Sequence, residues 1–145
     1  MILFSSALEL ELNNSIIMNN LIVDATRDKI FLVFIVSKNI YTSSHENSKT
    51  NFEKLMILID EFLKENKRSL DDISVIYVNR GPGSFAGIRN SLSTIKALFL
   101  TKKIDYYCFS FEDFIESKTS KYVDVPQLCH KYKIKKNLIN PIYLS

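Results

Sequence analysis

Short apolar runs alternate along the chain with longer segments of helical periodicity. The first three runs lie close together and favour strands joined by tight turns. The run at residues 30–36 is continuous and rich in β-branched residues, which suits a central strand. The later runs are separated by periodic segments and indicate strands connected by helices. The predicted strands are residues 21–24, 30–36, 40–43, 73–78 and 104–109, and the predicted helices are residues 47–67 and a long segment beginning near Phe85.

This order of elements, β, β, β, α, β, α, β, predicts an α/β fold. Three hairpin-linked strands followed by helix-connected strands give a mixed sheet with flanking helices, the arrangement of a ribonuclease H-like layer. One stripe of the first predicted helix is apolar, and Ile57 and Leu58 lie off this stripe. The stripe consists of Phe52, Leu55, Met56, Ile59, Phe62 and Leu63.

The second predicted helix has two distinct faces. An apolar face is predicted to cover the sheet. A face of smaller residues leaves two interpretations open, a solvated surface or a surface that lets another helix approach closely. Because glycine costs about 1 kcal/mol relative to alanine inside a helix, Gly87 favours the surface that receives a partner. The apolar face is Phe85, Ile88, Leu92, Ile95 and Phe99, and the predicted partner-binding face is Gly87, Ser91, Thr94 and Leu98.

All three glycines of the chain lie between residues 81 and 87, at the junction of a predicted strand and the second helix. Ser84 is placed to cap this helix, and the free N–H groups of the first turn, flanked by Arg80 and Arg89, could bind a phosphate. The spacing matches neither the phosphate-binding loop nor the dinucleotide fingerprint. The sequence therefore favours a structural turn that serves capping and tight packing, and this turn consists of Gly81, Pro82, Gly83 and Ser84.

Composition limits the class of protein. A chain of 145 residues that is 46% apolar and 24% charged is typical of one globular domain. The net charge of +3 is too small to indicate nucleic-acid binding by itself, and no apolar run reaches the roughly 18–20 residues that span a bilayer. Cys108 and Cys129 are far apart in the sequence and are interpreted as free thiols, which predicts a reducing, cytoplasmic location.

Residue types that commonly carry catalysis or bind metals are sparse. His45 and His130 have no second ligand at metal spacing, and the spacings support no serine–histidine–aspartate arrangement. Asp24 ends the first predicted strand, where it is either a strand-end capping carboxylate or a magnesium ligand, and a lone carboxylate is a poor magnesium site. We therefore expect neither catalytic residues nor a metal site in this chain.

Residues 81–89 resemble the signature of a known family. They read Gly-Pro-Gly-Ser-Phe-Ala-Gly-Ile-Arg, and the TsaB (YeaZ) family carries Gly-Pro-Gly-Ser-Phe-Thr-Gly-Leu-Arg. Residues 21–26 resemble the opening strand of that family, residues 44–46 the entry to its first long helix, and residues 140–145 its closing motif. On these residues the chain is identified as a member of the family, which belongs to the actin/Hsp70/sugar-kinase superfamily.

The resemblance implies a division of the chain. Residues 18–114 correspond to the first, ribonuclease H-like lobe, and residues 115–145 are expected to be a remnant of the second lobe with a basic tail. Residues 1–17 lack the features of a signal peptide and are interpreted as an N-terminal extension, either a start-site artefact or an extra helix or strand. The tail leaves open a contact with tRNA or a solvated cap. Its charged residues are Lys118, Lys121, Lys131, Lys133, Lys135 and Lys136 against Asp124.

The resemblance also implies a function. A family member is expected to be a non-catalytic scaffold that supports a TsaD-type catalytic subunit in threonylcarbamoyl-adenosine modification of tRNA beside the anticodon. A TsaE-type ATPase and a second copy of the chain are further implied partners, and tRNA would be contacted indirectly. No cofactor is expected on the chain alone, since ATP and magnesium would belong to the partner subunits. The alternative is a stand-alone ATP-binding enzyme of the actin-like superfamily, although every glycine already lies in one turn.

Overall fold

The computed structural model describes residues 18–115 and 121–143 of the chain. The predicted N-terminal extension at residues 1–17 lies outside the described residues, as does Lys118 of the basic tail. The last two residues of the closing motif, 144 and 145, also lie outside them.

The strands form one mixed five-stranded sheet in the order β3-β2-β1-β4-β5. The first three strands make an antiparallel meander, and β4 and β5 run parallel to β1. This is the α/β architecture that the order of apolar runs predicts, and the predicted fold is confirmed. The strands are β1 (Asn20–Asp24), β2 (Lys29–Val36), β3 (Asn39–Glu46), β4 (Val75–Asn79) and β5 (Asp105–Phe109).

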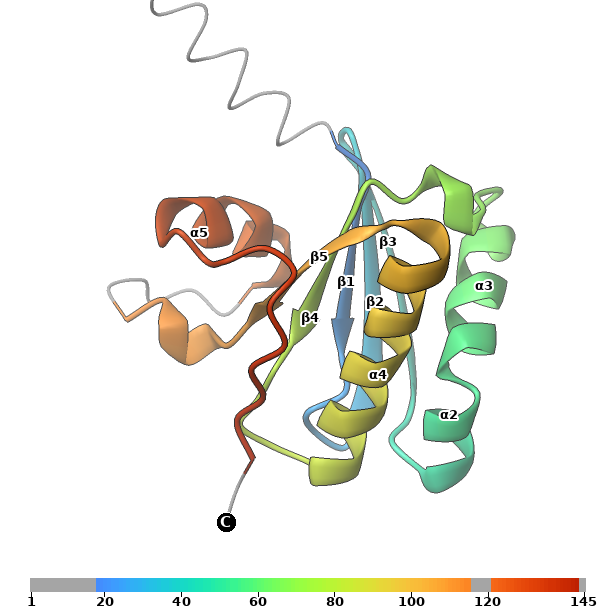
Figure 1. The fold of residues 1–145 in the computed structure, drawn as a ribbon. Coiled ribbons are helices and arrows are strands. Elements are labelled where there is room, and N and C mark those ends of the chain that lie inside the picture. The colour runs from blue at the N-terminus through green and yellow to red at the C-terminus, as the bar shows by residue number, and fades with distance from the viewer. Residues whose placement is uncertain (1–17, 116–120, 144–145) are drawn as a thin grey trace, which may run out of the picture.

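Helices cover both faces of this sheet (Figure 1). The two faces are covered unequally, because α2, α3 and the long α4 lie on one face and the short α5 lies on the other. Within the described residues no helix is both long and apolar enough to cross a membrane. The helices are α2 (Lys49–Glu53), α3 (Leu55–Glu65), α4 (Phe85–Lys102) and α5 (Val125–Lys131).

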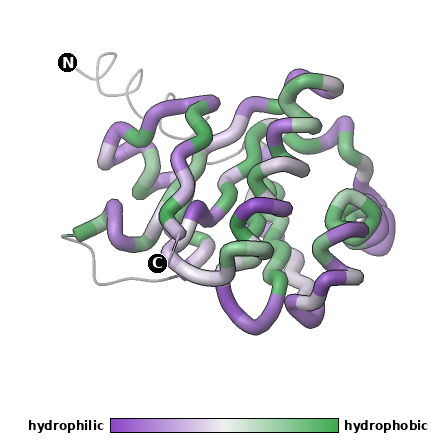
Figure 2. Tube along the Cα trace, turned by 60° about the horizontal axis from the view of Figure 1, so that its bottom comes forward, coloured by the Kyte–Doolittle hydropathy of each residue, from purple (hydrophilic) through white to green (hydrophobic). Residues whose placement is uncertain are grey.

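Two separate cores result, one on each face of the sheet. Successive side chains of a strand point to opposite faces, so Leu21 and Val23 belong to the core beneath α3 and α4, whereas Ile22 belongs to the core beneath α5. The hydropathy of the trace follows this arrangement, with hydrophobic segments through the middle of the molecule and hydrophilic segments at its periphery (Figure 2). Burial of apolar surface on both faces therefore holds the sheet in place.

The helix predicted at residues 47–67 is two helices. Ser48 caps α2, and the backbone at Lys54 (φ −113°, ψ 25°) leaves the helical region before α3 begins. Leu58, which lies off the predicted stripe, is buried, while Ile57 is exposed as predicted. The buried stripe of α3 is wider than expected because this helix packs against the sheet and against α4 at once.

The third strand is longer than predicted. It continues beyond Ser43 to Glu46, and its last residues pair with the start of β2, where Ile30 lies opposite His45. Residues 44–46 therefore belong to a strand and do not enter the first helix directly. Apolar patterning could not predict this extension, because residues 44–46 of this edge strand are all polar.

The C-terminal segment packs directly against the sheet. After α5 it crosses the outer edge of β5, where Lys136 bridges to Tyr107 and the Asn137 side chain accepts from the Tyr106 N–H at 2.9 Å. Val125 and Leu128 of α5 belong to the core on the second face. Residues 121–143, predicted to be part of a lobe remnant, thus cover a face and an edge that the sheet would otherwise expose.

Candidate functional site

A buried polar junction lies where β1 and β4 end side by side. Asp24, the last residue of β1, is only 1% exposed. Its Oδ1 accepts from the N–H of Thr26 at 2.9 Å and from the Thr26 hydroxyl at 2.7 Å. Its Oδ2 accepts from the Asn79 side-chain amide at 3.0 Å and from the Tyr122 hydroxyl at 2.7 Å. Four donors from three parts of the chain thus converge on one carboxylate.

The junction does not fit a magnesium ion. Magnesium needs carboxylate oxygens that are free to coordinate it, and each oxygen of Asp24 already accepts two protein donors. Among residues 18–115 and 121–143 no group of three metal-ligating side chains occurs. The pKa of Tyr122 is raised by burial and by the Asp24 carboxylate, which keeps the phenol protonated as a donor. Asp24 is therefore a structural acceptor, the alternative to magnesium that its position at a strand end left open.

The glycine turn packs against the chain that follows β1. A Cβ atom at Gly87 would lie closer than 3.0 Å to the Ala25 carbonyl oxygen, and one at Gly83 equally close to the Thr26 carbonyl oxygen. Gly81 has φ +113°, a backbone conformation that favours glycine. Ser84 caps α4 by accepting from the Gly87 N–H at 3.2 Å. The turn therefore serves packing and capping. The carbonyl oxygens of Ala25 and Thr26 lie directly against its glycines, so a phosphate has no room to bind there.

Arg80, which flanks this turn, is committed to internal contacts. Its guanidinium pairs with the carboxylate of Asp113 at 2.5 Å, and both side chains are largely buried. A second nitrogen donates to the Asn140 carbonyl at 3.0 Å, and the Arg80 carbonyl accepts from the Ile142 N–H at 2.7 Å. Arg80 thus holds the C-terminal segment in place, whereas Arg89 on α4 is exposed.

The faces of α4 differ from the prediction. Of the four residues predicted to bind a partner, Gly87, Ser91 and Leu98 are buried within the chain. Thr94 is half-buried, and its hydroxyl donates to the carbonyl one turn earlier. Phe85, predicted to face the sheet, is instead 56% exposed. The reason is that the sheet covers one side of α4 and α2 and α3 cover another, so the close-packed neighbours come from the chain itself.

A different stripe of α4 faces solvent. Its residues lie three or four positions apart, so they share one side of the helix. Phe85 and Leu100 at the two ends of this side are large and apolar, whereas Ser93 and Ala97 between them are small. Leu100 is 67% exposed. We call this the outer stripe, and it consists of Phe85, Arg89, Ser93, Ala97 and Leu100.

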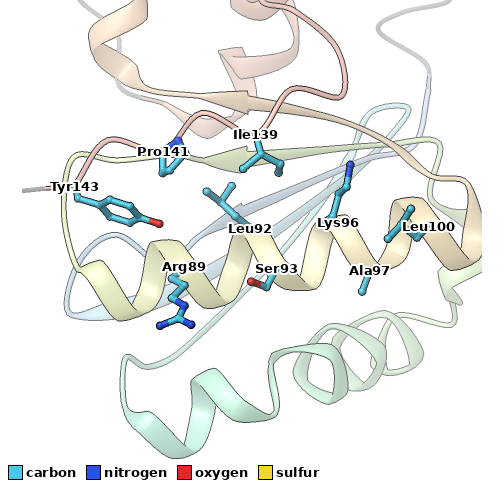
Figure 3. Close-up of a pocket in the computed structure, with 9 residues that line it drawn as sticks. All are labelled: Arg89, Leu92, Ser93, Lys96, Ala97, Leu100, Ile139, Pro141 and Tyr143. Carbon is cyan, nitrogen blue, oxygen red and sulfur yellow. The ribbon is translucent and has the colours of Figure 1, made fainter.

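A groove of about 400 Å³ adjoins the outer stripe. It lies between α4 and residues 139–143, which run alongside the helix (Figure 3). Apolar side chains from both segments line it, and Arg89 and Lys96 add positive charge. The ring centroids of Tyr143 and Phe85 lie 4.7 Å apart, so the two segments are in contact there. This arrangement is suited to binding an apolar or acidic segment of another molecule.

Sequence reasoning missed the two structural features that matter most here. Tyr122 donates to Asp24 across 98 positions of sequence, and no spacing rule reports such a pair. The outer stripe was visible as the four-residue spacing of Arg89, Ser93 and Ala97, but Phe85 was assigned to the buried face. Helical periodicity identifies which residues share a face, and it does not say which of several faces is exposed.

The two thiols are buried on β5 and α5 and have no disulfide. Burial raises the pKa of Cys108 from its ordinary value of 9.0 to about 11 and raises that of Cys129 further in the same direction. At pH 8 the Cys108 thiolate should therefore be about a hundredfold scarcer in the folded chain than in the unfolded chain. We expect Ellman's reagent to label both thiols only after unfolding, and rapid labelling of the native chain would contradict this burial.

Comparisons with known proteins agree with the fold. A family model described as TsaD, tRNA N6-adenosine threonylcarbamoyltransferase, matches residues 35–113. The chain is similar to the tRNA threonylcarbamoyladenosine biosynthesis protein TsaB of Buchnera aphidicola subsp. Baizongia pistaciae (strain Bp), with 35% identity over 83 residues. It is also similar to the protein of that name in subsp. Schizaphis graminum (strain Sg), with 28% identity over 119 residues.

These similarities are partial in length. The matches cover 50% and 82% of this chain, and the chain spans 38% and 52% of the two relatives. Among solved structures, YeaZ from Pseudomonas aeruginosa superposes with a TM-score of 0.58 at 17% identity. That match covers 63% of this chain and 43% of the YeaZ chain, so it supports the fold of the described sheet and helices.

Proposed function

The chain belongs to the TsaB (YeaZ) family of tRNA threonylcarbamoyladenosine biosynthesis proteins. From this membership, from the TsaB relatives and from the exposed surface of α4, we propose that the chain is a non-catalytic subunit that binds and supports a TsaD-type catalytic subunit during threonylcarbamoyl-adenosine modification of tRNA. A TsaE-type ATPase and a second copy of the chain are further partners in this proposal. ATP and magnesium would be held by the partner subunits.

The outer stripe of α4 is the observation that carries this proposal. It presents two large apolar side chains, Phe85 and Leu100, on a rigid 18-residue helix. Between them, Ser93 and Ala97 leave room for the backbone of a second helix to approach closely, since small residues at four-residue spacing do not hold it off. The proposed partner surface therefore replaces the Gly87 face, which is interior.

The polar junction supports a binding role over a chemical one. Catalysis by a carboxylate needs an oxygen that can reach the substrate, and the oxygens of Asp24 are buried beneath Thr26, Asn79 and Tyr122. The polar side chains at this end of the sheet are thus engaged in holding the fold together. Surface that remains available on α4 is apolar and basic, which suits the apolar and acidic side chains of a protein partner.

The proposal can be tested by co-expressing the chain with the TsaD-type subunit of the same genome and measuring association by size-exclusion chromatography. Ser93→Arg places a long charged side chain in the middle of the outer stripe and should weaken association at least about 30-fold, which corresponds to about 2 kcal/mol. The matched control is Ser44→Arg, which makes the same change at an exposed position of β3.

Equal effects of the two arginine variants would contradict the outer stripe as the partner surface. A second measurement addresses the ATP-binding alternative, namely binding of ATP by the isolated chain and by the mixture. Binding in the mixture alone is expected for the scaffold. Tight binding by the isolated chain would overturn the non-catalytic assignment.

A further inference from the structure

The C-terminal segment of the molecule carries an excess of positive charge. Residues 121–143 contain five lysines and one aspartate, an excess of four charges, while the entire chain has a net charge of +3. The charges of the remaining residues nearly cancel in sum, although residues 80–104 contain five basic residues and no acidic one. A local excess of positive charge attracts anionic ligands to that part of the molecule.

Packing holds the lysines of this segment outward. Tyr132 and Ile134 are half-buried and pack on the core of the second sheet face. Lys131, Lys133 and Lys135 occupy the alternate positions and are exposed. Since the intervening side chains anchor the backbone, the three ammonium groups lie on the outer surface next to exposed His130. We call these four residues the basic surface.

The lysines of the basic surface have no carboxylate partner within the described residues. Lys136, their neighbour, is paired with Asp105 at 3.6 Å. The Lys131 Nζ atom lies 5.5 Å from the ring centroid of Tyr132, and Lys131 forms no ion pair with a described residue. Charges that no carboxylate of the described residues neutralises are open to an external anion.

The basic surface is separate from the proposed partner surface. α5 lies on one face of the sheet, and α2, α3 and α4 lie on the other (Figure 1). A protein docked on the outer stripe of α4 would therefore leave accessible the lysines at the end of α5 and beyond it. The two surfaces can bind different partners at the same time.

We propose that the basic surface binds the phosphate backbone of RNA, and that within the proposed function this RNA is the tRNA undergoing modification. Lysine is a flexible point charge that suits phosphate contacts more than base reading. The binding is therefore sequence-independent, and the isolated chain should bind RNA with a Kd of about 10⁻⁴ to 10⁻⁶ M at physiological salt.

The geometry favours RNA over an anionic membrane. A segment that binds at a membrane interface directs apolar side chains outward into the lipid. Here Ile134, which lies between Lys133 and Lys135, is directed toward the core on the sheet, as are Val125 and Leu128 of α5. Electrostatic contact with a polyanion in water needs no such apolar insertion, so the surface as built suits nucleic acid.

The test measures binding of the full chain to an unmodified tRNA transcript by fluorescence anisotropy between 50 and 200 mM salt. Three phosphate contacts correspond to a slope of log K against log salt of about −2.1 to −2.7, so affinity should fall roughly 20- to 40-fold over this range. Replacing Lys131, Lys133 and Lys135 together with glutamine should remove most of this slope. The matched control replaces Lys49, Lys54 and Lys67 with glutamine, an equal change of charge at exposed positions that includes, at Lys67, the same left-handed backbone as Lys133.

Loss of the salt-dependent slope in the first triple variant and its retention in the control would support the proposal. An equal change in both variants, or in neither, would overturn it. Binding of phosphatidylserine vesicles that depends on these lysines, without RNA binding, would assign the surface to membranes and overturn it as well. Co-purification with the TsaD-type subunit and RNA binding are both measured on the lysine variants and on Ser93→Arg. If Ser93→Arg loses association with the subunit but still binds RNA, the two surfaces are separate. If the wild-type chain fails to associate with the subunit, that result counts against the scaffold proposal alone.

Discussion

Gly87→Ala is expected to destabilise the chain by about 3 kcal/mol, although alanine is the better helix former by about 1 kcal/mol. The reason is steric. A Cβ atom at this position would lie closer than 3.0 Å to the carbonyl oxygen of Ala25, a backbone atom of a buried residue just after β1 that cannot turn away. Either α4 or the sheet must shift, and both belong to the larger core. Gly87→Arg, with a much larger side chain, should abolish the native fold.

Urea denaturation followed by circular dichroism measures this effect as a lower midpoint. The control is Ser93→Ala, which replaces an exposed residue of the same helix and should change the free energy of unfolding by less than about 0.5 kcal/mol. If Gly87→Ala instead raised the midpoint, as helix propensity alone predicts, the close approach of α4 to Ala25 would be wrong.

Asp24→Ala should be comparably severe, with a loss of about 4 kcal/mol in the free energy of unfolding. The substitution leaves the donors of Thr26, Asn79 and Tyr122 without an acceptor in a buried site, and each unpaired buried donor costs about 1–3 kcal/mol. Partial relaxation and water entry reduce the sum. Against a total stability of about 5–15 kcal/mol for a small domain, this is a large share.

Thermal and urea denaturation check this value, and Asp28→Ala is the matched control because Asp28 is exposed four residues further along the chain. Tyr122→Phe removes one of the four donors and should cost less, about 1 kcal/mol. Combining both substitutions measures their coupling, since the phenol has no acceptor to lose once Asp24 is absent. Strictly additive losses would show that the Asp24 and Tyr122 side chains do not interact in solution.

These two predictions test whether Gly87 and Asp24 serve the fold or serve a function directly. Both residues occupy positions where a sequence motif invites a chemical interpretation, the turn before α4 and the end of β1. The structure engages Gly87 with the Ala25 backbone and Asp24 with four internal donors. Variants at these positions should therefore lose partner binding only because they lose the fold, whereas Ser93→Arg should lose partner binding with the fold intact.

The helices show how far a pattern of residues can be read. The spacing of Ile88, Leu92 and Ile95 correctly identified a buried face of α4. The smallness of Gly87 and Ser91 correctly indicated a close approach, but the approaching backbone is that of the chain itself. Side-chain size reports how near a neighbour comes and contains nothing about which neighbour it is.

By itself the sequence determined the order of the five strands and of the helical segments between them, the α/β class and the turn at residues 81–84, because periodicity and glycine placement act on neighbouring residues. Only the tertiary structure decided that Tyr122 seals Asp24, that α5 covers the second sheet face, and that the outer stripe faces solvent. Each of these depends on contacts between residues far apart in the chain. Such contacts form when apolar surface is buried in three dimensions, and local spacing carries no record of the partner that buries it.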